Sequence, residues 1–186
     1  MTREELYDCL EGSPIIAAVH DNLFQEALAS PSAVVFLLGG NLFTLPERVK
    51  AARAAGKRVF VHIDLTDGVA KDKTGVEFVA RCGADGIIST KASLLKNAKE
   101  AGLLTVQRCF VYDSQGVDNI HSMLSNSTPD LMELMPGVIG KIIRRFADAR
   151  VPVIAGGLIE TKAEATAALT MGAYAVSTGK RELWYM

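Results

Sequence analysis

The sequence predicts an α/β protein, built as a compact (β/α)8 barrel of the TIM type with a shortened last unit. The chain contains eight short runs rich in β-branched residues, separated by segments of helical length and composition. Several runs, such as AVVFLL at Ala33–Leu38, are apolar at consecutive positions. Strands buried on both faces of a helix-covered parallel sheet have this pattern. The 186 residues fit one domain, 1–186, and because the fold usually needs ~250 residues its helices must be short. An open doubly wound sheet is the alternative.

The expected strands follow one another along the whole chain. In chain order they are Pro14–Val19, Ala33–Leu38, Arg58–Asp64, Asp85–Thr90, Leu103–Val111, Asp130–Pro136, Val151–Leu158 and Ala173–Thr178.

Helix-start signals support the segments between these strands. Thr44 and Glu47 have the spacing of a capping box, and so do Thr161 and Glu164. We therefore expect one helix to begin after Thr44 and another after Thr161.

The last unit has little chain left for a helix. Only Gly179–Met186 follows the eighth strand. We expect Trp184 and Tyr185 to seal the barrel there in place of a full helix.

Composition excludes several classes of protein. Hydrophobic residues make up 49% and charged residues 22%, which excludes global disorder. No stretch reaches 18 uncharged apolar residues, so no membrane span is expected. The first residues lack the apolar core of a signal peptide, so we expect the protein in the cytoplasm. Three cysteines without a close pair indicate free thiols. The net charge of −1 means that any RNA contact would need a local basic patch.

Polar residues occur where the strands of a TIM barrel place functional groups, at their C-terminal ends. His62 and Asp64 share one face of the third strand because side chains alternate along a strand. Arg108 and Glu133 are costly to bury unless they are paired or bound to a ligand. A salt-bridge network closing the barrel mouth explains any one of these residues equally well. A ring of them favours ligand binding.

Two loops predict a phosphate site. Gly156 and Gly157 end the seventh strand, and Ser177 and Thr178 end the eighth. In such barrels the loops after these two strands commonly bind phosphate, and glycine lets the backbone approach an anion. The full set of residues that we expect to bind a ligand is His62, Asp64, Lys91, Arg108, Glu133, Gly137, Gly156, Gly157, Ser177 and Thr178.

Other chemistries have weaker signals. His20, His62, Asp64 and Glu133 could form a metal site, but no dense ligand motif is present. No nucleophile or nucleotide motif occurs either. We therefore assign no metal, no organic cofactor and no catalytic residue.

A basic cluster is the candidate for nucleic-acid contact. Lys141, Arg144 and Arg145 share one helical face at spacings of three and four residues. A solvated helix face is the more common explanation of such a cluster.

Motifs along nearly the whole chain resemble one known family. They include VHIDL at 61–65, DGIISTK at 85–91, TVQR at 105–108 and ELW at 182–184. In combination they resemble the glycerol uptake operon antiterminators, the glycerol-3-phosphate-responsive regulators of bacteria. The resemblance implies a barrel that senses sn-glycerol 3-phosphate as its effector. It also implies that the protein acts on the leader mRNA of glycerol genes to prevent premature termination. The candidate contacts for this RNA are Lys141, Arg144 and Arg145, because they share one face of the helix expected after the Glu133 strand.

Two other functions stay open at this point. Barrels that prenylate glycerol 1-phosphate have a similar glutamate-bearing sixth strand and similar glycine loops, and would need a long apolar groove. A barrel that serves as a scaffold would leave its ring of charges paired with one another. The sequence leaves the oligomeric state open, a homo-oligomer included.

Overall fold

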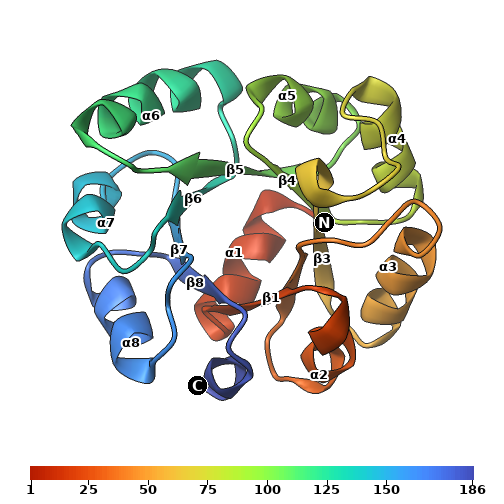
Figure 1. Cartoon of the computed structure of the whole chain (residues 1–186), viewed down its shortest axis with the longest axis horizontal. Coiled ribbons are helices and arrows are strands. Elements are labelled where there is room, and N and C mark those ends of the chain that lie inside the picture. Colours follow the sequence, from red (N-terminus) through yellow and green to blue (C-terminus); the bar gives the residue numbers. More distant parts are fainter.

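A computed structural model describes the backbone of residues 1–186 and the side chains other than that of Asp21. Parallel strands β1 to β8 follow one another in chain order and close into a barrel, with every α-helix after the first arranged around its outside (Figure 1). The barrel closes where Ile15 of β1 pairs with Val176 of β8. The predicted TIM-type barrel is confirmed, and the open doubly wound alternative is wrong.

Each strand lies within its predicted run and is shorter than that run. They are β1 (Ile15–Val19), β2 (Val34–Leu37), β3 (Arg58–His62), β4 (Gly86–Ser89), β5 (Leu104–Phe110), β6 (Leu131–Met135), β7 (Val153–Gly156) and β8 (Ala175–Thr178). The α-helices are α1 (Arg3–Gly12), α2 (Phe24–Ala29), α3 (Leu45–Ala54), α4 (Lys73–Arg81), α5 (Ala92–Glu100), α6 (Ser114–Ser127), α7 (Gly140–Phe146) and α8 (Lys162–Thr170). Short 3-10 helices are η1 (Asp21–Leu23), η2 (Ile63–Leu65) and η3 (Arg181–Tyr185).

Alternate residues of each strand enter two separate cores. In β3, Phe60 packs inside the barrel, whereas Val59 and Val61 pack between the strands and the outer helices. Both faces of every strand are therefore apolar, which is why the strands contain consecutive apolar residues.

Helix α1 closes the N-terminal end of the barrel, a role that the sequence analysis did not identify. Leu6 and Leu10 are buried and belong to the inner core. A capping box between Thr2 and Glu5 starts the helix. The Tyr7 hydroxyl donates to the carbonyl of Asp130, just before β6, at 3.2 Å. With this end occupied, the open end of the barrel lies at the C-terminal ends of the strands.

The two predicted capping boxes differ in outcome. Thr161 and Glu164 form one at the start of α8, as predicted. Helix α3 begins directly after Thr44 as predicted, but Thr44 makes no cap hydrogen bond, so the prediction of a capping box there is wrong. The Asn41 side chain instead accepts the backbone N–H groups of Phe43 and Thr44, at 3.0 and 3.1 Å. This Asx-type turn directs the chain into α3.

The last unit is the five-residue helix η3 in place of a full helix. Trp184 is 1% exposed, and its indole N–H donates to the carbonyl of Thr178 at 2.9 Å. Tyr185 is 57% exposed, so the prediction that it seals the barrel is wrong. Trp184 alone of the pair covers the outside of the barrel here, in contact with the β1 and β8 region.

In the part of the chain that the structure describes, no helix has both the length and the apolar character needed to cross a bilayer.

Candidate functional site

The open end of the barrel has a ring of polar side chains on its inner face. His62 and Arg108 each come two residues after an inner-core residue of their strands, Phe60 and Val106. Glu133 and Ser177 continue the same alternation in β6 and β8. Period-two geometry therefore points all four into the barrel mouth.

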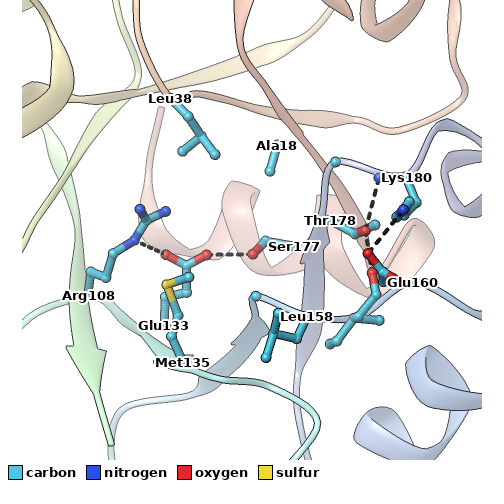
Figure 2. Close-up of a pocket in the computed structure, with 13 residues that line it drawn as sticks. Ala18, Leu38, Arg108, Glu133, Met135, Leu158, Glu160, Ser177, Thr178 and Lys180 are labelled. Atoms are coloured by element: carbon cyan, nitrogen blue, oxygen red, sulfur yellow. Dashed lines mark hydrogen bonds and ion pairs between the residues drawn. The ribbon is translucent and has the colours of Figure 1, made fainter. Parts of the chain in front are cut away.

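Glu133 is the centre of this ring. It is 1% exposed, and its Oε2 accepts the Nε–H of Arg108 at 2.7 Å. Its Oε1 accepts the Ser177 hydroxyl at 2.5 Å. Arg108 and Glu133 are direct partners in the register of β5 and β6, and Figure 2 shows the three side chains in one row. The buried carboxylate is thus charge-paired and hydrogen-bonded, as a buried charge must be.

Gly156 makes room for the Glu133–Ser177 contact. A Cβ at this position would lie 2.5 Å from Oε1 of Glu133 and 2.7 Å from the Ser177 hydroxyl oxygen. Gly137 packs nearby, because its N–H donates to the carbonyl of Gly156 at 2.6 Å. In this structure both glycines permit close packing, and the ligand contact predicted for them stays a prediction.

A cavity of about 380 Å³ opens beside Glu133, on the β6–β8 side of the mouth. We call it the mouth cavity. Its lining includes five of the predicted ligand-binding residues, which are Arg108, Glu133, Gly157, Ser177 and Thr178. The remaining wall consists of Ala18, Leu38, Met135, Leu158, Ile159, Glu160, Gly179 and Lys180.

Lys180 and Glu160 are the charged cavity residues that sequence reasoning missed. Lys180 Nζ and Glu160 Oε1 form an ion pair of 3.0 Å across the loops after β7 and β8 (Figure 2). Both side chains are about half exposed, at 47% and 60%. The signal for Lys180 was its place directly after Gly179 in the predicted phosphate loop.

The two hydroxyls predicted as phosphate donors already have protein partners. Ser177 donates to Glu133, and the Thr178 hydroxyl donates to the carbonyl of Ile159 at 2.8 Å. Thr178 also accepts the backbone N–H of Lys180 at 3.1 Å. Thr178 therefore connects the β7 loop to the β8 loop.

The backbone N–H groups at the start of α8 also have a hydrogen-bond partner within the protein. The N–H groups of Glu160 and Thr161 both donate to Oε2 of Glu164, each at 2.9 Å. The backbone bond from Glu160, with those from Thr161, lowers the pKa of the Glu164 carboxyl. Just before it, Gly157 and Leu158 have φ angles of 75° and 59°. A left-handed leucine is uncommon, and such backbone clusters at ligand sites.

The other half of the mouth contains Asp64 and Lys91, and neither lines the mouth cavity. Asp64 Oδ2 accepts the Ser89 hydroxyl at 2.9 Å and the Thr90 N–H at 2.8 Å. Lys91 is exposed at the start of α5. Asp64 thus connects the ends of β3 and β4.

His62 is a buried, neutral member of the ring. It is 3% exposed, and its Nδ1 has no hydrogen-bond partner among the described residues. Burial, reinforced by the positive charge of Arg108, lowers its pKa to about 4. The 3.9 Å approach of Nδ1 to Oδ2 of Asp64 is therefore not an ion pair at neutral pH, because the imidazole is uncharged.

This histidine predicts an acid-sensitive fold. In the unfolded chain His62 takes up a proton near pH 6.5, whereas in the folded chain it does so only near pH 4. The free energy of unfolding should therefore fall as the pH drops from 6.5 to 4, by about 3 kcal/mol in total. Urea unfolding followed by circular dichroism at several pH values measures this. His62→Gln should remove this part of the dependence of the unfolding free energy on pH. The control His20→Gln, at an exposed position, should keep it. An unchanged slope in His62→Gln would assign the acid sensitivity to other groups.

The alternative metal set does not come together. Among the side chains that the structure describes, His, Cys, Asp and Glu form no group of three that could hold a metal ion.

The three candidate RNA contacts on α7, Lys141, Arg144 and Arg145, differ in the residues that surround them. Arg145 pairs with Asp118 of α6 at 3.0 Å. Arg144 points its guanidinium at the sulfur of Met171, beyond α8, at 3.3 Å. Lys141 and Arg145 line a second cavity between the start of α6 and α7, and Arg144 is not in its lining.

Comparisons with known proteins find one matching family model and a similar curated relative. A family model described as glycerol-3-phosphate responsive antiterminator matches residues 15–184. The uncharacterized protein YgcP of Escherichia coli (strain K12) is 37% identical over 182 residues, which cover 96% of this chain and 95% of that protein.

Two solved structures are similar over almost their full length. A glycerol uptake operon antiterminator-related protein from Thermotoga maritima superposes with a TM-score of 0.84 and 35% identity, covering 94% of this chain and 99% of the other. The glycerol uptake operon antiterminator regulatory protein from Listeria monocytogenes gives a TM-score of 0.86 and 34% identity, with coverages of 91% and 94%.

Proposed function

The chain belongs to the glycerol-3-phosphate responsive antiterminator family, and on that basis we propose that it is a transcription antiterminator whose effector is sn-glycerol 3-phosphate. The effector binds in the mouth cavity. The liganded protein then binds the leader mRNA of glycerol uptake and metabolism genes, in the cytoplasm, and prevents premature termination. The family match supports the RNA half of this proposal, and the geometry around Glu133 supports the effector half.

The observation that carries effector binding is the buried Glu133 carboxylate at the cavity wall. Each carboxylate oxygen can accept more than one hydrogen bond, so Glu133 can accept from a ligand hydroxyl while keeping Arg108 and Ser177. Arg108 and Lys180 supply two cations in the same cavity. A small molecule with hydroxyls at one end and a phosphate at the other complements this set of charges.

Lys180 is the cation best suited to the phosphate. Its pair with Glu160 lies at the surface, where an ion pair contributes little to stability. A phosphate can therefore take the ammonium group from Glu160 at small cost. The loop that carries Lys180 also carries Gly179, in the region where TIM barrels commonly bind phosphate.

The same cavity argues against the enzyme alternative. A prenyl-transferring barrel would need a long apolar groove, whereas the mouth cavity measures about 380 Å³ and contains two cations and two carboxylates. His62, the best candidate for a general base, lies outside its lining. We therefore propose a regulatory role without catalysis, metal or organic cofactor.

Replacing Lys180 tests the phosphate contact. Lys180→Met should weaken binding of sn-glycerol 3-phosphate by about 1.5–3 kcal/mol, because it removes a charged hydrogen-bond donor. Isothermal titration calorimetry measures this, with glycerol and inorganic phosphate as comparison ligands. Lys96→Met, on the exposed outer face of α5, is the matched control and should bind as the wild type does.

Three results would contradict the proposal. Wild-type protein that binds no sn-glycerol 3-phosphate would exclude it as the effector. Equal affinity in Lys180→Met and wild type would move the phosphate elsewhere. Turnover of glycerol phosphate that disappears in Glu133→Ala would favour the enzyme.

A further inference from the structure

Two exposed aromatic rings lie at the end of β5. The rings of Phe110 and Tyr112 are nearly parallel, with 15° between their planes and 5.9 Å between their centroids. Tyr112 is 86% exposed and Phe110 is 40% exposed. Exposed aromatics held in a parallel pair offer a flat apolar face to a ring-shaped partner.

Tyr112 of this pair lines the second cavity, which we call the aromatic groove. The groove has a volume of about 440 Å³ and runs between the start of α6 and α7, which are neighbours in Figure 1. Val117, Ile139 and Ile142 provide apolar surface, with Tyr112 among the lining residues. Lys141 and Arg145 add two cations from successive turns of α7.

The cations of the groove are available to an anionic partner. Arg145 pairs with Asp118, but these side chains are 51% and 69% exposed, so the pair is weak and open to competition. Within the described part of the chain, Lys141 has no carboxylate at ion-pair distance.

We propose that the aromatic groove binds a single-stranded segment of RNA, with a base stacked on Tyr112 and the adjacent phosphates on Lys141 and Arg145. Single strands are recognised by stacking of unpaired bases on aromatic side chains beside basic residues. A duplex keeps its bases stacked inside and offers Tyr112 none. This inference rests on the proposed function. It adds which surface of the protein binds the RNA, and that the bound RNA is single-stranded.

The groove is connected to the mouth cavity through two paired strands. Arg108 pairs in register with Glu133, and two residues later Phe110 pairs with Met135, which also lines the mouth cavity. The next N–H, that of Val111, donates to the carbonyl of Met135 at 2.8 Å. A ligand that rearranges Arg108 and Glu133 thus acts directly on the segment that carries the aromatic pair. Coupling of this kind is reciprocal, so RNA should also tighten effector binding.

The test is an anisotropy titration with a fluorescein-labelled, random-sequence single-stranded RNA pool and with the same pool annealed to its complement. Both are measured with and without sn-glycerol 3-phosphate. Wild-type protein should prefer the single strand. Tyr112→Ala should weaken that binding roughly 5-fold to 100-fold, whereas Tyr112→Phe keeps a stacking ring and should bind nearly as well. Lys141→Gln with Arg145→Gln should flatten the salt dependence.

Phe43→Ala is the matched control, because Phe43 is an equally exposed aromatic, at 87%, in the loop after β2. It should leave RNA binding unchanged. Normal RNA binding by Tyr112→Ala, or an equal loss in Phe43→Ala, would overturn the groove while leaving the proposed function intact. A wild type that does not bind the pool, with or without the effector, would also overturn the groove as a site for single-stranded RNA. A change in sedimentation rather than RNA affinity in Tyr112→Ala would assign the groove to contact between copies of the chain, and would also overturn the inference.

Discussion

Glu133→Ala is expected to lower the free energy of unfolding by about 3–5 kcal/mol. The substitution leaves the guanidinium of Arg108, only 7% exposed, without its carboxylate partner. Ser177 loses its acceptor at the same time. Urea unfolding at neutral pH, followed by circular dichroism, measures the difference.

A double variant separates the cost of the unpaired charge from the loss of ligand binding. Arg108→Met with Glu133→Leu replaces the ion pair by apolar side chains, which is often neutral or stabilising for a buried pair. We expect this variant to recover most of the stability and still fail to bind sn-glycerol 3-phosphate. A loss below about 1 kcal/mol in Glu133→Ala would mean that water or another group replaces the carboxylate without strain.

Trp184→Ala is expected to destabilise the fold by a similar amount, about 3–5 kcal/mol, because it leaves a large cavity outside the barrel. It also leaves the carbonyl of Thr178 without the indole N–H. Tyr185→Ala is the control, since the adjacent ring is more than half exposed. It should change stability by less than about 0.5 kcal/mol.

Circular dichroism is again the measurement for this pair, because the chain has a single tryptophan and the variant removes it. Equal losses of stability in Trp184→Ala and Tyr185→Ala would contradict the view that Trp184 alone takes the place of a full helix after β8.

The barrel could be predicted because its signal is spread along the whole chain. Each strand needs apolar residues on two faces, so runs such as Val34–Leu37 remain recognisable without knowledge of their neighbours. Helix α1 could not be recognised in this way. The role of Leu6 and Leu10 as a closing surface depends on a barrel that forms from residues far along the sequence.

The candidate site shows the same division between local and long-range information. The placement of Glu133 and Ser177 at the mouth follows from strand alternation, which is local. The pairing of the Ser177 hydroxyl with the Glu133 carboxylate depends on the register between β6, β7 and β8. No pattern in the sequence predicts that register. The role of Gly156 also depends on long-range register, since its neighbours come from β6 and β8.

The connection between Lys180 and Glu160 also depends on the fold. Each residue follows its own strand, and twenty positions in the sequence separate them. Only the parallel pairing of β7 and β8 brings their loops together.

The seam between β1 and β8 determines when the barrel can close during synthesis. Residues near Ile15 leave the ribosome well before their strand partners near Val176, which are made about 160 residues later. Until then the nascent sheet has two open edges, and an open edge readily pairs with another chain. The barrel can therefore close only after the β8 segment has been made. Conditions that protect the growing chain from neighbouring chains at that moment should decide how much of the newly made protein reaches the closed form.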